Sequence, residues 1–300
     1  MNYRIENDRL CVEISSLGAE IQSVLGRDGT EYIWQGDGRY WKDRAINLFP
    51  YIGRLPADGY QTGGARYRMD IHGFLKDSEM TVVADDESDN NGGGKEAAVS
   101  FRLDDSEATR GMYPFPFSLR VGYTLQENTL MIDYEVINTG REPMYFGIGG
   151  HPGFGLPLEP GLAFEDYYLE FEEGRESRRC ETTDALLMSG NEPAFPLEGG
   201  KTLRLEHSLF DEDAIILRDM GQSVALRSRK GERGVSLRFP HMRYLGLWHT
   251  PRTKAPFLCV EPWTSLPALD GAPEVLEDKP DLIKLPPGER YLNKWEITFF

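Results

Sequence analysis

The sequence contains little cysteine and no cysteine spacing typical of a structural site. Cys11, Cys180 and Cys259 are the three cysteines among 300 residues, and none belongs to a CxxC pair. An odd number of widely spaced cysteines argues against a disulfide framework and against a structural zinc site. Reduced thiols in the cytoplasm are the simplest interpretation.

Positive charge and long apolar runs are also scarce. Lysine and arginine together number 33 against 49 acidic residues, which gives a net charge of −16 at pH 7. Such a surface repels phosphate backbones and anionic membranes, so no nucleic acid partner is expected. No run reaches the roughly 18 apolar residues of a membrane span. The polar first residues, MNYRIENDRL, lack the apolar stretch of a signal peptide. We therefore expect a cytoplasmic protein without a membrane partner.

Common cofactor and protease motifs are absent as well. GxxxxGK[ST], HExxH, GxSxG and an EF-hand loop do not occur. The segment 147–152 begins like a dinucleotide-binding loop, but its sixth position is Pro152 and no βαβ pattern surrounds it. A metal site built from His72, His151 and Glu261 has no ligand-like spacing to support it. We expect neither a cofactor nor a metal.

The pattern that is present is an alternation of apolar and polar residues, the period of a β-strand. Residues 115–137 alternate on both sides of Glu127-Asn128, which predicts a long hairpin with one buried face. Further strands are expected at 3–5 with 10–14, 21–25 with 32–34 across Asp28-Gly29, 224–226 with 235–237, and 295–300. The 32 glycines and 19 prolines disfavour long helices. The prediction is a large antiparallel all-β sandwich with few short helices, a single domain over residues 1–300.

One stretch of low complexity interrupts the alternation. Asp85–Glu96 reads DDESDNNGGGKE and lies between two strand-like segments. Its acidic, glycine-rich composition predicts a mobile surface loop, with a linker between domains as the alternative.

Two of the five histidines stand beside glycine. His72 precedes Gly73, and His151 lies in the segment Gly149-Gly150-His151-Pro152-Gly153. Glycine allows a ligand to approach the backbone closely, and imidazole transfers protons near neutral pH. Both histidines are therefore candidates for proton transfer, with a structural histidine in a turn as the alternative.

A glutamate at an expected strand end is the third candidate. Glu261 follows the apolar run 256–260 and precedes Pro262 and Trp263. Partial burial would raise the pKa of this carboxyl toward a value that suits a general base, and Trp263 would form an apolar wall or a sugar platform. A solvated glutamate is the alternative.

Charged residues beside turns supply candidates for binding. Arg54 ends the segment Asn47–Arg54, whose proline and glycine shape a turn, and a guanidinium there can donate several hydrogen bonds, for example to sugar oxygens. The acidic residues 211–213 lead into an apolar strand. A surface arginine and a solvated strand entry are the respective alternatives.

Taken in order, these motifs resemble the aldose 1-epimerase (galactose mutarotase) family. The similarity extends over most of the chain, and the strand Tyr244–Trp248 (YLGLW) is similar to a compact branch of that family. The ordered set is Asn47 with Gly53-Arg54, His72-Gly73, Gly150-His151-Pro152, Asp213, and Glu261-Pro262-Trp263. The resemblance implies a large twisted β-sandwich with an open sugar-binding cleft on one sheet.

The resemblance also implies roles for the residues that match. Glu261 would be the general base and His151 the general acid of a cofactor-independent ring opening of a free aldose. A protonated His151 beside an anionic Glu261 would stabilise each other's charge. The implied sugar contacts are His72, Arg54, Asn47, Trp263 and Asp213, with Asp211 as the alternative to Asp213. The sequence leaves open which aldose is the substrate and whether the protein is a monomer or a homodimer.

Three other functions stay open at this point. A hexose-6-phosphate 1-epimerase would need clustered basic residues at the cleft, and Arg54 alone does not supply them. A non-catalytic carbohydrate-binding protein on the same fold would not need the pair of His151 and Glu261. A glycoside hydrolase or lyase would use two carboxylates, such as Glu261 and Asp213, and would leave the histidines without a role.

Overall fold

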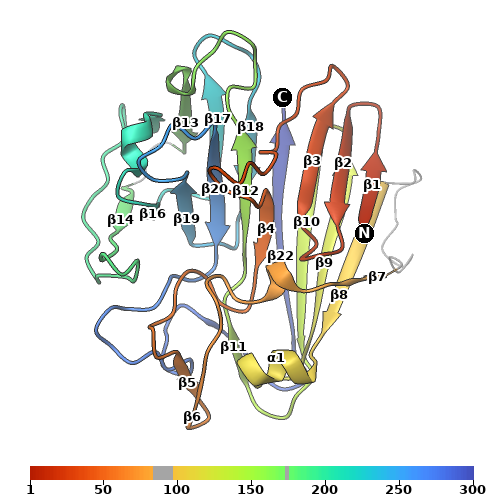
Figure 1. Ribbon diagram of the computed structural model, residues 1–300, viewed down its shortest axis with the longest axis vertical. Helices are drawn as coiled ribbons and strands as arrows, with labels where there is room; N and C mark the ends of the chain where they lie inside the picture. Colours follow the sequence, from red (N-terminus) through yellow and green to blue (C-terminus); the bar gives the residue numbers. More distant parts are fainter. Residues whose placement is uncertain (84–96, 173–175) are drawn as a thin grey trace.

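The computed structural model describes residues 1–83, 97–172 and 176–300, which form mainly antiparallel β-strands (Figure 1). The all-β sandwich predicted from the sequence is confirmed. The helices in the described residues are short, namely α1 (Glu107–Met112) and the 3₁₀ helices η1 (Leu75–Asp77), η3 (Phe164–Asp166) and η4 (His207–Phe210). The stretch Asp85–Glu96, predicted to be a surface loop, lies outside the described residues.

A nine-stranded antiparallel sheet forms one layer. Its order is β15 (Thr202–Arg204), β13 (Tyr167–Phe171), β17 (Ser223–Ser228), β18 (Val235–Arg238), β22 (Arg290–Phe299), β10 (Thr129–Asn138), β9 (Phe117–Gln126), β8 (Ala97–Asp104) and β7 (Thr81–Val83). The long strands β9, β10 and β22 alternate between buried and more exposed residues, as expected of strands with one face on the core.

A six-stranded sheet carries the residues that matter for function. Its order is β14 (Arg178–Cys180), β16 (Ile215–Arg218), β19 (Tyr244–Trp248), β20 (Phe257–Trp263), β12 (Gly149–Gly155) and β4 (Ala45–Leu48). All residues of β20 and nearly all of β12 are buried, so both faces of this sheet are covered.

Three small sheets complete the structure. The first is β1 (Asn2–Glu6), β2 (Leu10–Ser15) and β3 (Ile21–Gly26), and the two-stranded ones are β5 (Tyr60–Thr62) with β6 (Ala65–Tyr67) and β11 (Met144–Phe146) with β21 (Ile283–Leu285). In Figure 1 strands β1–β3 lie in front of β8–β10. The rings of Tyr3 on β1 and Phe101 on β8 are 5.4 Å apart, which confirms that these layers are packed together.

The core fills the space between the nine-stranded sheet and the layer opposite it. One continuous cluster joins Val12 of β2, Val121 of β9, Ile132 of β10 and Val260 of β20. Burial of such side chains stabilises the fold by about 25 cal/mol for each Å² of apolar surface. The outward face of the six-stranded sheet carries two separate, smaller apolar clusters, one around Trp263 and one around Cys259.

Most predicted hairpins are confirmed. Strands β9 and β10 meet at the turn Glu127-Asn128, β1 and β2 pair across Asn7-Asp8, and β17 pairs with β18. The last strand, β22, begins at Arg290, earlier than the pattern predicted. The pairing of residues 21–25 with 32–34 is limited to local contacts, because Ile33 forms its bridge with Phe154 of β12 instead.

Candidate active site on the six-stranded sheet

His151 and Glu261 lie side by side on neighbouring strands. The pairing of Gly149 with Trp263 and of Gly153 with Cys259 puts His151 of β12 opposite Glu261 of β20. Both side chains therefore project from the face that points away from the main core. The Nε2 atom of His151 is 3.1 Å from Oε2 of Glu261, and the two residues are 7% and 2% exposed. This is a buried acid–base pair.

Burial acts on the protonation of this pair. It lowers the pKa of His151 to about 3. It also raises the pKa of Glu261 well above its usual value, to which the nearby charge of Asp213 adds. Both directions favour neutral groups, with the proton on Glu261. This is the reverse of the ion pair that the sequence suggested, because desolvation of both charges was not visible in the sequence.

One polar atom of the pair has no partner. Within the described chain, Nδ1 of His151 is buried without a hydrogen bond, whereas Oε2 of Glu261 faces Nε2 of His151 at 3.1 Å. Buried polar atoms are normally hydrogen-bonded, and exceptions occur where a bound ligand supplies the missing hydrogen bond. The pair therefore has unused hydrogen-bonding capacity that a ligand with hydroxyl groups would satisfy.

His72 lies beside the pair as a neutral donor. The backbone N–H of Gly53 donates to Nδ1 of His72 over 3.1 Å, so the ring proton belongs on Nε2. The rings of His72 and His151 are 5.4 Å apart and perpendicular. Burial lowers the pKa of His72 well below its usual value, and protonation of His151 would act in the same direction. A neutral imidazole that donates from Nε2 suits a hydroxyl or ether oxygen of a ligand.

Close backbone contact fixes the loop that holds His72. Gly73 has a φ of +73°, and a Cβ atom there would lie 2.3 Å from the carbonyl oxygen of Phe49. The N–H of Phe74 donates to that same oxygen over 3.1 Å. Any other residue at position 73 would push the loop off the end of β4.

Asp213 contacts the site through Trp248. The Nε1–H of Trp248 donates to Oδ1 of Asp213 over 2.7 Å. Burial raises the pKa of Asp213, while this hydrogen bond and the charge of Arg54 act in the opposite direction. Asp211 is exposed, and its backbone oxygen accepts from Arg252 over 3.3 Å. The structure therefore brings Asp213 to the site and leaves Asp211 outside it.

Arg54 provides positive charge at the rim. It is exposed, directly follows Gly53, and is close enough to influence the pKa of both His72 and Asp213. Among the residues whose structure is described, no ion pair involves its guanidinium. Arg54 is thus available to a ligand that lies between His72 and Asp213.

Tryptophans surround the pair, and two of them were not predicted. The ring of Trp41 is 4.8 Å from that of His151 and tilted by 32°, and Trp248 is 6.0 Å from His151 at 75°. Trp263 is only 3% exposed and lies 6.4 Å from His72, so it is a buried wall and not an open platform. Trp248 could have been identified from the sequence, because Tyr244, Gly246 and Trp248 alternate along one strand and therefore share a face. Trp41 lies in a loop and follows no such pattern.

The structure does not bring Asn47 into the site. Its Nδ2 donates to the carbonyl oxygens of Gly18 and Ala19 and to the hydroxyl of Tyr123, each over 3.0 Å. Its Oδ1 accepts from the hydroxyl of Tyr134 over 2.7 Å. These bonds give Asn47 a structural role, and its contact with a substrate remains a prediction. On β4 it is Ile46 that lies opposite His151, and the next residue points to the other face of the sheet.

Carboxylate, imidazole and thiol groups come together at one point of this face. His151, Cys259 and Glu261 each offer one ligand atom, and these atoms lie within 4.8 Å of one another. Cys259 was not predicted as a site residue, although it precedes Glu261 by two positions on the same strand. The set of His72, His151 and Glu261 considered in the sequence is unsuitable for a metal, because Nδ1 of His72 already accepts a hydrogen bond and Nε2 carries the proton.

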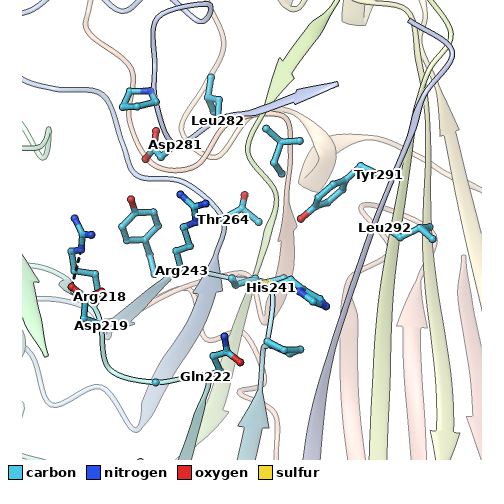
Figure 2. A pocket seen from close by; sticks show the side chains of 16 residues that line it. Arg218, Asp219, Gln222, His241, Arg243, Thr264, Asp281, Leu282, Tyr291 and Leu292 are labelled. Carbon is cyan, nitrogen blue, oxygen red and sulfur yellow. Dashed lines mark hydrogen bonds and ion pairs between the residues drawn. The ribbon is translucent and has the colours of Figure 1, made fainter. Parts of the chain in front are cut away.

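A separate cavity of about 940 Å³ lies at the end of β19, away from the acid–base pair (Figure 2). Figure 2 shows Arg218, Arg243, Asp281 and Tyr291 around it. Arg218 is engaged in ion pairs with Glu192 and Asp219. None of the site residues predicted from the sequence lines this cavity, so its size alone does not indicate where chemistry occurs.

In the described part of the chain, no helix is both long and apolar enough to cross a bilayer.

Comparisons with known proteins identify the family of this chain. The family model described as aldose 1-epimerase matches residues 1–297. Protein LacX of Lactococcus lactis subsp. lactis, in its plasmid and chromosomal forms, is 34% identical over 99% of both chains.

Two solved structures are similar over the whole chain. A galactose mutarotase related enzyme from Lactobacillus acidophilus is 33% identical with a TM-score of 0.90, and the match covers 100% of this chain and 97% of the other. A galactose mutarotase-like protein from Lactobacillus casei ATCC 334 is 30% identical with a TM-score of 0.91, and the match covers 100% of both chains.

Proposed function

Because this chain belongs to the aldose 1-epimerase family, we propose that it interconverts the α and β anomers of a free aldose. The observation that supports this proposal most strongly is the buried pair of His151 and Glu261, with 3.1 Å between Nε2 and Oε2. Opening a cyclic hemiacetal needs one base and one acid at the same carbon centre. The pair supplies both groups.

Ring opening begins at the anomeric hydroxyl. The Glu261 carboxylate takes the proton from O1, while the His151 imidazolium gives a proton to the ring oxygen O5. The C1–O5 bond breaks, and O1 becomes the carbonyl oxygen of the free aldehyde. Each proton transfer contributes roughly 10²–10⁴-fold to the rate.

Ring closure reverses these steps after a rotation. The aldehyde turns about its C1–C2 bond, so that O5 attacks the opposite face of C1. His151 takes back the proton of O5, and Glu261 returns its proton to O1. Atoms and charges balance without a co-reactant, and each group has acted once as acid and once as base.

The resting protonation of the site is compatible with this cycle. The pair needs one proton in total, and burial favours that proton on Glu261. Transfer to His151 over 3.1 Å gives the working form without exchange with solvent. Hydroxyl groups of the sugar would solvate the two charges formed, which lowers the free energy of the ion pair.

The remaining site residues act in binding in this proposal. Nε2–H of His72 and the guanidinium of Arg54 donate to sugar oxygens, and the carboxylate of Asp213 accepts from sugar hydroxyls. Trp41, Trp248 and Trp263 cover apolar C–H surface of the ring. The site offers few free cations to bind the phosphate of a 6-phosphorylated sugar. Arg54 is available, but Lys76, the other cation that acts on His72, is already paired with Asp77.

Polarimetry tests the proposal directly. The optical rotation of freshly dissolved α-D-glucose and α-D-galactose should approach its equilibrium value faster with the protein than in weakly catalysing buffer alone. Glu261→Gln and His151→Ala should each lower kcat/KM about 10²–10⁴-fold. Glu212→Gln, an exposed glutamate one residue from Asp213, is the matched control and should keep the wild-type rate.

Each alternative function gives a different result. Binding of both sugars by calorimetry without any acceleration would indicate a carbohydrate-binding protein. Acceleration limited to glucose 6-phosphate or galactose 6-phosphate would indicate the phosphorylated substrate. A Glu261→Gln variant that converts sugar at the wild-type rate would contradict the role given to this residue.

A further inference from the structure

The proposed reaction makes no use of Cys259, the thiol beside the acid–base pair. Cys259 lies on β20 two residues before Glu261, so their side chains share one face of the strand. Its backbone pairs with Gly153 of β12, two residues after His151. The side chain is fully buried. A thiol, an imidazole and a carboxylate are thus held together by two adjacent strands.

The spacing of the three groups suits a single cation. Their ligand atoms lie within 4.8 Å of one another. In a tetrahedral zinc site, with bonds of about 2.0–2.3 Å, ligand atoms are about 3.3–3.8 Å apart. Closing the difference needs side-chain movements of about 1 Å, which do not require the strands to separate.

An unsatisfied atom provides an independent indication of a missing ligand. Nδ1 of His151 is buried without a hydrogen-bond partner within the described ranges, and the residue is only 7% exposed. A cation bound at this nitrogen would remove the unfavourable burial of an unpaired polar atom.

We propose that His151, Cys259 and Glu261 bind one thiophilic divalent cation such as Zn²⁺ or Cd²⁺. Nitrogen, sulfur and oxygen donors in one site select such ions over Mg²⁺ and Ca²⁺, which prefer oxygen alone. The cation displaces two protons to solvent, that of the thiol and the one held by the pair of His151 and Glu261, and it leaves a fourth coordination position for water. The bound ion occupies both groups of the acid–base pair, so metal and sugar exclude each other. This last statement rests on the proposed function, whereas metal binding does not.

Cadmium titration of the chelator-treated protein tests the site. A cadmium–thiolate charge-transfer band in the ultraviolet should grow with the binding of one Cd²⁺ per chain. Cys259→Ser should abolish the band, and Glu261→Gln, which keeps the thiol, should weaken Cd²⁺ binding at least about tenfold. Cys180→Ser, at another buried thiol, and Cys11→Ser are the matched controls and should keep both band and affinity.

The outcomes separate the site from its alternatives. A band that persists in Cys259→Ser, or that disappears in Cys11→Ser or Cys180→Ser, would overturn the assignment. If Cys259→Ser does not fold, Glu261→Gln decides, and unchanged Cd²⁺ affinity in that variant would refute the proposal. Mg²⁺ should not displace Cd²⁺.

Inhibition kinetics test the overlap with the sugar. Zn²⁺ or Cd²⁺ should slow the mutarotation of α-D-galactose competitively, and a chelator should restore the rate. A charge-transfer band at Cys259 together with uninhibited turnover would contradict the overlap but not the site. A protein that binds Cd²⁺ without catalysing mutarotation would contradict the proposed function alone.

Discussion

At the scale of single residues, two site side chains are held by unusual backbone conformations. His72 has a φ of +66° and Asp213 a φ of +87°, in the left-handed region that residues other than glycine rarely adopt. Such conformations persist only where surrounding contacts determine them, and they concentrate at functional sites. Here the contacts are the hydrogen bonds of Gly53 to His72 and of Trp248 to Asp213.

Trp248 is expected to act as a positioning residue for Asp213. Trp248→Phe removes the only indole N–H within 2.7 Å of that carboxylate in the described chain. A hydrogen bond to a charged group contributes about 1.5–3 kcal/mol. Misplacing Asp213 should therefore raise KM about tenfold while kcat changes much less, as measured by initial-rate polarimetry over a range of sugar concentrations.

A double-mutant cycle separates this effect from the contact between Trp248 and His151. Trp248→Phe should have little further effect on KM when combined with Asp213→Asn, because the two changes remove the same interaction. Additive effects on KM, or a loss confined to kcat, would show that Trp248 acts through His151 instead.

At the scale of secondary structure, β4 joins the two layers of the sandwich through one polar side chain. Asn47 bonds to Tyr123 of β9 and Tyr134 of β10 and to two carbonyl oxygens before β3. Asn47→Ala would leave these buried groups without their partner. We expect a loss of about 2–4 kcal/mol in the free energy of unfolding, measured by urea denaturation.

The same variant distinguishes the structural role of Asn47 from the binding role that the sequence suggested. Well below its unfolding temperature, Asn47→Ala should keep the wild-type KM, because its side chain faces the core. Asn191→Ala, at an exposed asparagine, should change neither quantity. A raised KM with unchanged stability would support contact with the sugar.

Hairpins were the most predictable elements. The alternation over residues 115–137 determined β9, β10 and the turn between them, because a strand with one buried face must alternate. The turn dipeptide Asp28-Gly29 predicted that residues 32–34 pair with 21–25. The turn is present, but Ile33 pairs with β12. Competition from a distant strand cannot be read from a local pattern.

At the scale of the whole molecule, the buried His249 and its half-buried neighbour His207 make stability depend on pH. Nδ1–H of His249 donates to the carbonyl of Thr250 over 2.9 Å, and Nε2 lies 3.1 Å from Nδ1 of His207. Burial lowers the pKa of His249 to about 4, although the hydrogen bond to Thr250 and the charge of Asp211 act in the opposite direction. His207 faces Glu165 and Lys254. Both histidines are therefore neutral in the folded protein at pH 7.

The sign of the pH effect follows from the lowered pKa. In the unfolded chain His249 titrates near pH 6.5, so its contribution to stability is complete above that value and is lost as the pH falls toward about 4. The loss should amount to about 2–3 kcal/mol. It is measured as the difference between urea unfolding free energies at pH 7.5 and pH 4.

Substitution isolates the contribution of His249. The difference between the two pH values should shrink by about this amount in His249→Gln, which keeps a hydrogen-bonding side chain but does not titrate. His241→Gln, at an exposed histidine, should leave the difference unchanged. An equal pH dependence in all three proteins would show that His249 does not control acid stability.

The sequence by itself determined the all-β class, most of the hairpins, and the residue types that could transfer protons. Alternation and turn dipeptides are local, and so they could be read directly. The ordered motifs also predicted the family. The prediction of a single domain over residues 1–300 and the roles given to the site residues remain predictions.

Only the tertiary structure decided which of these residues meet. Strand pairing puts His151 opposite Glu261 and adds Cys259, and it turns Asn47 away from them. Burial, which depends on the packing of Trp41, Trp248 and Trp263, decides the charge of the pair. These outcomes arise from contacts between segments that are distant in the sequence, and no local pattern contains the register or the desolvation of such contacts.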